Sequence, residues 1–130
     1  MFQLTKIKDA HAKVKSGADF PAYIQDLIQL GVLSYDTFVM DGHSVFNGAD
    51  NYTIQSEPKY APLNIAQLSN PEKFKQYLQL HQQGQTDYSA FCNHAAETGV
   101  EKWTVDMNTM TCTYYNSLQG KMLEEKIPAS

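Results

Sequence analysis

The sequence predicts a single α+β domain over residues 1–130, built from two helix-plus-three-strand-meander units whose helices pack on an antiparallel sheet. Its 130 residues, 42% hydrophobic and 18% charged, suit one globular domain. Seven residues within 19–35 are also matched by identical or similar residues within 87–103 at a constant offset (87 − 19 = 68). The matched residues are Asp19, Phe20, Ala22, Tyr23, Gly31, Val32 and Tyr35 against Asp87, Tyr88, Ala90, Phe91, Gly99, Val100 and Trp103.

The first half begins with two predicted helices. Apolar residues at helical spacing start at Leu4, and this helix is expected to end at residues 16–17. Asp19 then caps a strongly apolar helix that carries Pro21 in its first turn and stops at Gly31.

From Val32 the apolar period changes to two, which indicates β-strands. Asp41 and Gly42 predict a type I′ hairpin turn, since glycine tolerates positive φ and aspartate tolerates it better than most residues. A return strand through 44–46 and a short strand at 52–56 complete the first meander.

Residues 57–69 are predicted to be a surface linker, because Pro58 and Pro62 interrupt regular structure. A third helix starts at residues 70–72 and stops at Gly84. The fourth helix is capped by either Thr86 or Asp87, and it ends at Gly99.

The second meander is expected as strands at 100–107, around 110–114 and up to Ile127. Beyond Trp103 the second copy turns about one position sooner than the first. The half-repeats therefore span about 19–56 and 87–127, joined by the linker.

Composition and motifs exclude several classes of function. The net charge is −4 with scattered Lys and Arg, so no basic stripe is available for nucleic acid. No signal-peptide stretch or run of ~18 apolar residues occurs, which favours a soluble cytoplasmic protein without membrane association. Cys92 and Cys112 are expected to be free thiols. Neither cofactor motifs nor the spacing of metal ligands is present.

A catalytic hypothesis rests on Asp41 and His43, because a carboxylate and a histidine on an exposed hairpin tip could transfer protons. The alternative is a plain turn, which the backbone alone explains. Cys92 is a further candidate nucleophile, although its helical face favours a small buried hydrophobe. His11 and His81 are interpreted as histidines at the edge of the core, hydrogen-bonded to backbone carbonyls.

A binding hypothesis rests on four aromatic residues, Trp103, Tyr35, Tyr52 and Tyr115, which could present an apolar surface to a partner. Core packing is the alternative, above all for Trp103, whose counterpart in the repeat is Tyr35.

Two motifs carry a resemblance to a known family: Val39-x-Asp41-Gly42-His43-Ser44, and His81-Gln82-Gln83-Gly84-Gln85-Thr86-Asp87-Tyr88-x-x-Phe91-Cys92 with Gly99-Val100-Glu101-Lys102-Trp103. The chain resembles the YdfO-like family of small bacterial and prophage-encoded proteins of unknown function over nearly its whole length. The resemblance implies a compact α+β domain. Some members are labelled phage envelope proteins, but no catalytic residue or cofactor can be transferred.

Three functions stay open at this stage. The favoured one is a non-catalytic module that binds a host or phage protein through exposed aromatic residues. The second is a small enzyme with a cleft site that uses His43 and Asp41. The third is a homodimer formed through a free strand edge near 123–127.

Overall fold

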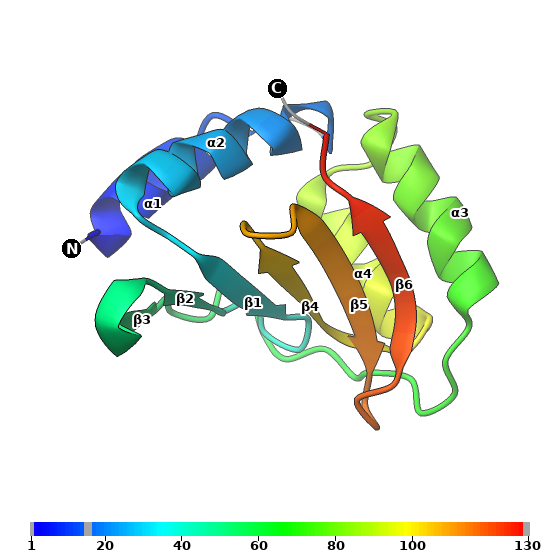
Figure 1. Cartoon of the computed structure of the whole chain (residues 1–130). Coiled ribbons are helices and arrows are strands. Elements are labelled where there is room, and N and C mark those ends of the chain that lie inside the picture. Colours follow the sequence, from blue (N-terminus) through cyan, green and yellow to red (C-terminus); the bar gives the residue numbers. More distant parts are fainter. Residues whose placement is uncertain (1, 15–16, 129–130) are drawn as a thin grey trace.

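Six strands form one antiparallel sheet in residues 2–14 and 17–128, the part of the chain that this computed structural model describes. They are β1 (Ser34–Phe38), β2 (Ser44–Asn47), β3 (Thr53–Gln55), β4 (Val100–Asp106), β5 (Thr111–Asn116) and β6 (Lys121–Lys126). Their order is β3-β2-β1-β4-β5-β6, so each half contributes a three-strand meander and the halves join at β1 and β4 (Figure 1).

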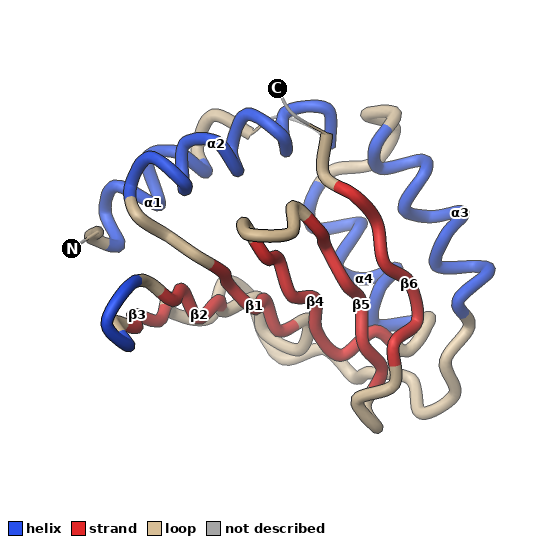
Figure 2. The backbone as a smooth tube through the Cα atoms, in the orientation of Figure 1, coloured by secondary structure: helices blue, strands red, loops and turns tan. Residues whose placement is uncertain are grey.

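Four helices precede the meanders in pairs: α1 (Leu4–His11), α2 (Phe20–Leu30), α3 (Pro71–Gln82) and α4 (Tyr88–Glu97). Short 3₁₀ turns, η1 (Gly17–Asp19) and η2 (Ala49–Asn51), lie in the first half. Each half has the same order of two helices followed by three strands, and Figure 2 distinguishes the helices (blue) from the strands (red). The predicted α+β domain of two helix-plus-meander units is therefore confirmed, with two helices in each unit.

Helix ends follow the local sequence. The Asp87 carboxylate accepts a hydrogen bond from the Ala90 N–H at 2.7 Å and so caps α4, which decides between the two predicted caps. Gly31 and Gly99 follow α2 and α4 with φ of 100° and 89°, a left-handed conformation that glycine adopts without strain.

The two units meet in a symmetric register. Asp36 of β1 lies opposite Thr104 of β4, and their separation (104 − 36 = 68) equals the offset of the sequence repeat. The Thr104 hydroxyl donates a hydrogen bond to the Asp36 carboxylate. An approximate two-fold axis therefore passes through this pair and relates one unit to the other.

The hairpins keep the same offset. Tyr35 lies opposite Phe46, and Trp103 lies opposite Tyr114 (103 − 35 = 68; 114 − 46 = 68). The expectation that the second copy turns one position sooner was therefore wrong. The register shifts elsewhere, between Val100 and Lys102 where β4 pairs with β5 and between Tyr114 and Tyr115 where β5 pairs with β6.

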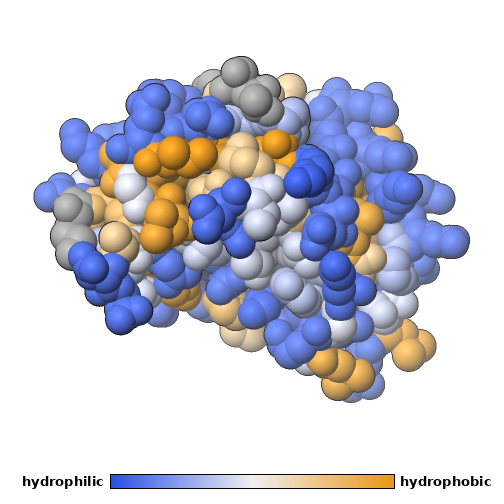
Figure 3. All heavy atoms as spheres, in the orientation of Figure 1, coloured by the Kyte–Doolittle hydropathy of each residue, from blue (hydrophilic) through white to orange (hydrophobic). Residues whose placement is uncertain are grey.

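All four helices pack on one face of the sheet. Tyr35, with Trp103 on the neighbouring strand, points towards the helices. There Tyr35 contacts Tyr23 of α2, and Trp103 contacts Phe91 of α4. Figure 3 shows apolar side chains (orange) beneath α2, between its hydrophilic outer side and the sheet. The core accordingly lies between one sheet face and the helices.

The loop between β1 and β2 differs from the predicted type I′ turn. Of its two central residues only Gly42 has a positive φ, 77°, so the type I′ assignment to Asp41 and Gly42 was wrong. The Phe38 N–H donates to the His43 carbonyl at 2.9 Å and closes a five-residue loop over residues 39–43.

Residues 57–69 contain no helix or strand, as expected of a linker. The Lys59 N–H donates to the Asp41 carbonyl at 2.7 Å, and the Ala66 N–H donates to the Ala96 carbonyl at 2.9 Å. The linker is thus held against a loop of the first unit and the end of α4 in the second.

The sheet ends at β3 and β6, so the stretch at 123–127 that was expected as a strand edge begins within the edge strand β6. In the described ranges, none of the helices has the length and apolar character needed to span a membrane.

Candidate functional site

A pocket of about 510 Å³ lies between the two helix pairs, over the two central strands. Its floor includes Tyr35 and Thr37 of β1 and Trp103 of β4. The helices line its walls with His11, Phe20, Tyr23, Leu78, His81, Tyr88 and Phe91. Because both units contribute, the pocket lies across the approximate two-fold axis. Its volume falls within the range of about 300 to 1,000 Å³ that is typical of small-molecule sites.

The aromatic lining follows the repeat. The rings of Tyr23 and Tyr35 have centroids 6.4 Å apart, and those of their counterparts Phe91 and Trp103 are 5.6 Å apart. Tyr88 makes an edge contact with Trp103 at 6.4 Å. Edge-to-face and tilted contacts of this kind are favourable between aromatic rings, so the rings of the lining stabilise one another.

The phenols of the pocket stay neutral. Burial raises the pKa of Tyr23, and it raises the pKa values of Tyr35 and Tyr88 well above the ordinary value of 10.0. These residues therefore offer apolar rings and hydroxyl groups without charge at physiological pH.

His11 connects the two units across the pocket. Its ring lies 5.3 Å from the Tyr23 ring of the first unit and 5.7 Å from the Tyr88 ring of the second. Burial, and then the positive charge of Lys59, lower the pKa of His11 below 6.5. The imidazole is consequently neutral at pH 7.

His81 lies on the wall formed by the second unit. Its ring stacks on Phe91 with centroids 4.4 Å apart, and its Nδ1 lies 3.1 Å from the Thr86 carbonyl oxygen. The predicted hydrogen bond to a backbone carbonyl is confirmed for His81. Burial lowers the pKa of His81, and this effect outweighs the hydrogen bond to Thr86 and the negative charge of Asp87, which both act to raise it. Across the described residues, no group of three or more His, Cys, Asp or Glu is placed to hold a metal ion.

Lys59 borders both this pocket and a second cavity of about 330 Å³, which also shares His11 and Tyr23. Its Nζ lies over the Tyr88 ring, 5.6 Å from the centroid, in a cation–π contact. The side chain as a whole is exposed, but burial around its ammonium group lowers the pKa of Lys59. The positively charged ammonium group of Lys59 therefore belongs to a residue that borders both cavities.

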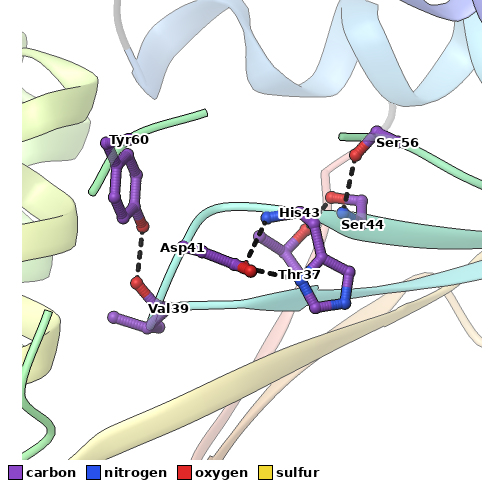
Figure 4. Close-up of polar contacts among 7 residues, drawn as sticks. All are labelled: Thr37, Val39, Asp41, His43, Ser44, Ser56 and Tyr60. Carbon is purple, nitrogen blue, oxygen red and sulfur yellow. Dashed lines mark hydrogen bonds and ion pairs between the residues drawn. The ribbon is translucent and has the colours of Figure 1, made fainter. Parts of the chain in front are cut away.

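Asp41 and His43, the predicted acid–base pair, contact each other in the loop after β1 (Figure 4). Asp41 Oδ1 lies 2.6 Å from His43 Nδ1 and accepts the His43 backbone N–H at 3.0 Å. Burial tends to raise the pKa of Asp41, but these hydrogen bonds outweigh it and hold the pKa below 3.8. The His43 ring stacks on Phe38 at 4.6 Å. Neither member of the pair borders the two cavities described above.

The cysteines are free thiols, as expected. Cys92 is only 1% exposed, and burial raises its pKa, although the nearby hydroxyls of Tyr60 and Tyr88 act in the opposite direction. Burial raises the pKa of Cys112, which borders the pocket, to about 12. Both groups stay protonated at pH 7, and a protonated thiol is a poor nucleophile.

The four aromatic residues of the binding hypothesis do not share one surface. Tyr35 and Trp103 are 4% and 6% exposed and line the pocket. Tyr52 is half-buried, and its hydroxyl donates to a backbone carbonyl near the N-terminus at 2.8 Å. Tyr115 is half-buried beside Lys102, whose Nζ lies 5.6 Å from its ring centroid. Only the first two can contact a ligand in the pocket.

No sequence motif marks Lys59 or Tyr88 as a functional residue, and the sequence predicts that His11 lies at the edge of the core. These residues come from the linker and from two different helices, so only the fold brings them together. The repeat could have indicated the role of Tyr88, because Tyr88 is the counterpart of Phe20 (88 − 20 = 68) and both residues border the pocket.

Comparison with known proteins addresses the family of the chain. No curated protein matches it. The model of a family described as a protein of unknown function (DUF1398) matches residues 8–126, which include both meanders and the second half of α1. The chain therefore belongs to this DUF1398 family of proteins of unknown function.

Proposed function

We propose that this protein is a non-catalytic binding module whose central pocket holds a small, largely apolar and aromatic molecule. The observation that carries the proposal is the pocket of about 510 Å³, walled by repeat-related aromatic residues of both units. Small-molecule sites generally combine such an apolar body with a few polar groups.

Incomplete packing is a poor explanation for a space of this size. Native interiors pack as densely as organic crystals and leave few voids larger than a water molecule. Here Tyr35, Trp103 and Tyr23 are each less than 10% exposed, yet all border the same space. Large rings held around an opening favour a site with an occupant.

The chemistry of the titratable groups supports binding over catalysis. The pair formed by Asp41 and His43 lies outside the pocket, and the Cys92 thiol is protonated and buried. Inside the pocket the phenols and His11 are neutral at pH 7, as their pKa shifts imply. An enzyme that uses His43 and Asp41 would need a substrate on the outside of the molecule.

We further propose that the chain is a YdfO-like bacterial or prophage protein and that it works in the cytoplasm. The motifs at 39–44 and 81–103 support this finer placement, together with the family match over 8–126. A host or phage protein partner, or a second copy at the edge of β6, would bind on the outside, since Tyr35 and Trp103 are buried.

A neutral fluorescent probe tests the pocket directly. N-phenyl-1-naphthylamine becomes fluorescent in apolar sites and accepts energy from tryptophan. Trp103 is the single tryptophan of the chain and borders the pocket, so bound probe should quench its emission and gain fluorescence itself. Cys112→Phe should weaken binding about tenfold or more by placing a ring in the pocket. Thr111→Phe, the matched control on the opposite sheet face, should bind like the original protein.

Two results would refute the proposal. One is probe fluorescence without quenching of Trp103, which would place the probe elsewhere. The other is equal affinity of the Cys112→Phe and Thr111→Phe variants. Near-UV circular dichroism checks that each variant is folded. If Cys112→Phe does not fold, the NMR shift of the Trp103 indole N–H on addition of the probe to the original protein decides instead, because energy transfer alone reaches across a protein of this size.

A further inference from the structure

We propose that the pocket selects aromatic molecules carrying a single negative charge, such as an aromatic carboxylate, and that Lys59 binds the charged group. This inference rests on the proposed function, because it names the class of ligand for the same pocket. It adds a specificity-determining residue that lies in the linker between the two units.

The first argument is the position of the ammonium group. Lys59 Nζ lies 5.6 Å from the centroid of the Tyr88 ring, and Tyr88 in turn contacts Trp103 of the pocket floor. A planar ligand packed against these rings would therefore place a substituent at its edge within reach of Lys59. Because Lys59 also borders the second cavity, the substituent has space there.

The charged groups that border the pocket differ in whether they have a polar partner within the protein. The Glu125 carboxylate accepts a hydrogen bond from the Gln82 amide at 3.0 Å, and Lys126 Nζ donates to the Thr109 carbonyl at 3.5 Å. In the described part of the chain, the ammonium group of Lys59 has neither a hydrogen bond nor an ion pair to a carboxylate. The contact that Nζ makes is with the Tyr88 ring. An anion would supply the missing charge-assisted hydrogen bond.

The positive charge of Lys59 and its burial change the pKa values of groups around the pocket. Burial lowers the pKa of Lys59, and the charge of Lys59 contributes to the lowered pKa of His11. Both shifts follow from a positive charge held near apolar groups without a counter-ion. An anion bound between the two residues would relieve this unfavourable arrangement.

The groups around Lys59 favour a ligand with one charge. Lys59 lies over the neutral phenol of Tyr88, and the residues that border both cavities with it are the neutral phenol of Tyr23 and the neutral imidazole of His11. A nucleotide or another polyanion would leave further charges against apolar rings, which is costly. A monoanion with an aromatic body matches both parts of the site.

A matched pair of probes provides the test. 8-Anilinonaphthalene-1-sulfonate and N-phenyl-1-naphthylamine share the same ring system and differ in one sulfonate group. In the original protein the sulfonate probe should bind about tenfold more tightly, measured by energy transfer from Trp103. Lys59→Gln should reduce this affinity ratio to about twofold or less. Lys102→Gln, which removes one positive charge from the other face of the sheet, should keep the tenfold ratio.

The outcomes separate the two proposals. If both probes quench Trp103 with equal affinity, or if Lys59→Gln keeps the tenfold ratio, the assignment to Lys59 is overturned while the pocket proposal stands. If neither probe quenches Trp103, the pocket proposal fails and this inference fails with it.

Discussion

Replacing Gly99 by alanine should destabilise the protein far more than replacing Gly31, although the two glycines are equivalent in the repeat (99 − 31 = 68). Each follows the second helix of its unit with a positive φ. The two sites differ in their surroundings, because the linker passes Gly99 but not Gly31.

The structure allows both costs to be worked out. An alanine in the left-handed conformation costs about 1 to 2 kcal/mol at either site. At Gly31 the added methyl group would meet only the Phe2 ring, at 3.9 Å, so this is the whole cost. At Gly99 the methyl group would lie 2.8 Å from Ser69 Cα and 3.1 Å from the Leu68 carbonyl oxygen. Displacing this backbone adds about 1 to 3 kcal/mol, as overpacking in a core does.

Urea titration of the two single variants measures the difference in the free energy of unfolding. A difference of about 2 kcal/mol corresponds to a gap of roughly 8 °C between their thermal midpoints. Equal losses in the two variants would refute the reasoning, because they would show that the linker does not pack against Gly99.

Three further predictions concern residues of the helices. Phe74→Ala should lower the free energy of unfolding by about 3 to 5 kcal/mol, since its ring is 0% exposed; a loss below about 1 kcal/mol in a urea titration would contradict this packing. His94→Phe should raise the thermal midpoint, because it removes a buried Nδ1 that has no hydrogen-bond partner among the described residues and keeps the ring stacked on Tyr77. A lower midpoint would show that Nδ1 is satisfied. Stability should fall as the pH drops from 6.5 towards 5, because burial lowers the pKa values of His11 and His81 in the folded protein, so that below 6.5 the unfolded chain takes up protons on these imidazoles more readily than the folded one. Urea titrations at several pH values should show a flatter slope for the His11→Phe, His81→Phe double variant.

Much of the fold could be predicted because its signals are local. Gly31 and Gly99 end helices for a reason that involves only their own backbone conformation. The constant offset between the halves fixed the equivalence of Tyr35 and Trp103, and the strand register extends that equivalence to the hairpins.

The loop after β1 could not be predicted, because a distant segment determines its shape. Asp41 and Gly42 suit a two-residue turn on their own. In the fold, however, the Lys59 N–H bonds to the Asp41 carbonyl, and the Tyr60 hydroxyl donates to the Val39 carbonyl at 2.6 Å (Figure 4). The linker thus holds the loop in a wider form.

The pocket was missed for a related reason. Periodicity shows that Trp103 and Tyr35 face inward, but it does not show whether the facing helices meet above them. The structure places α1 and α2 beside α3 and α4 with space between them, and His11 and Tyr88 border that space. Only the arrangement of the two units reveals a site there.

Binding of a ligand in the space between the two units can be measured by two-dimensional ¹H–¹⁵N NMR of the protein titrated with N-phenyl-1-naphthylamine. The indole N–H of the single tryptophan gives one resolved signal, which reports on this space. A probe bound between the units should shift this Trp103 signal and the amides of Thr37 and His11, which border the pocket. Shifts confined to Lys102 and Tyr115 on the other sheet face, or no shifts at all, would contradict it.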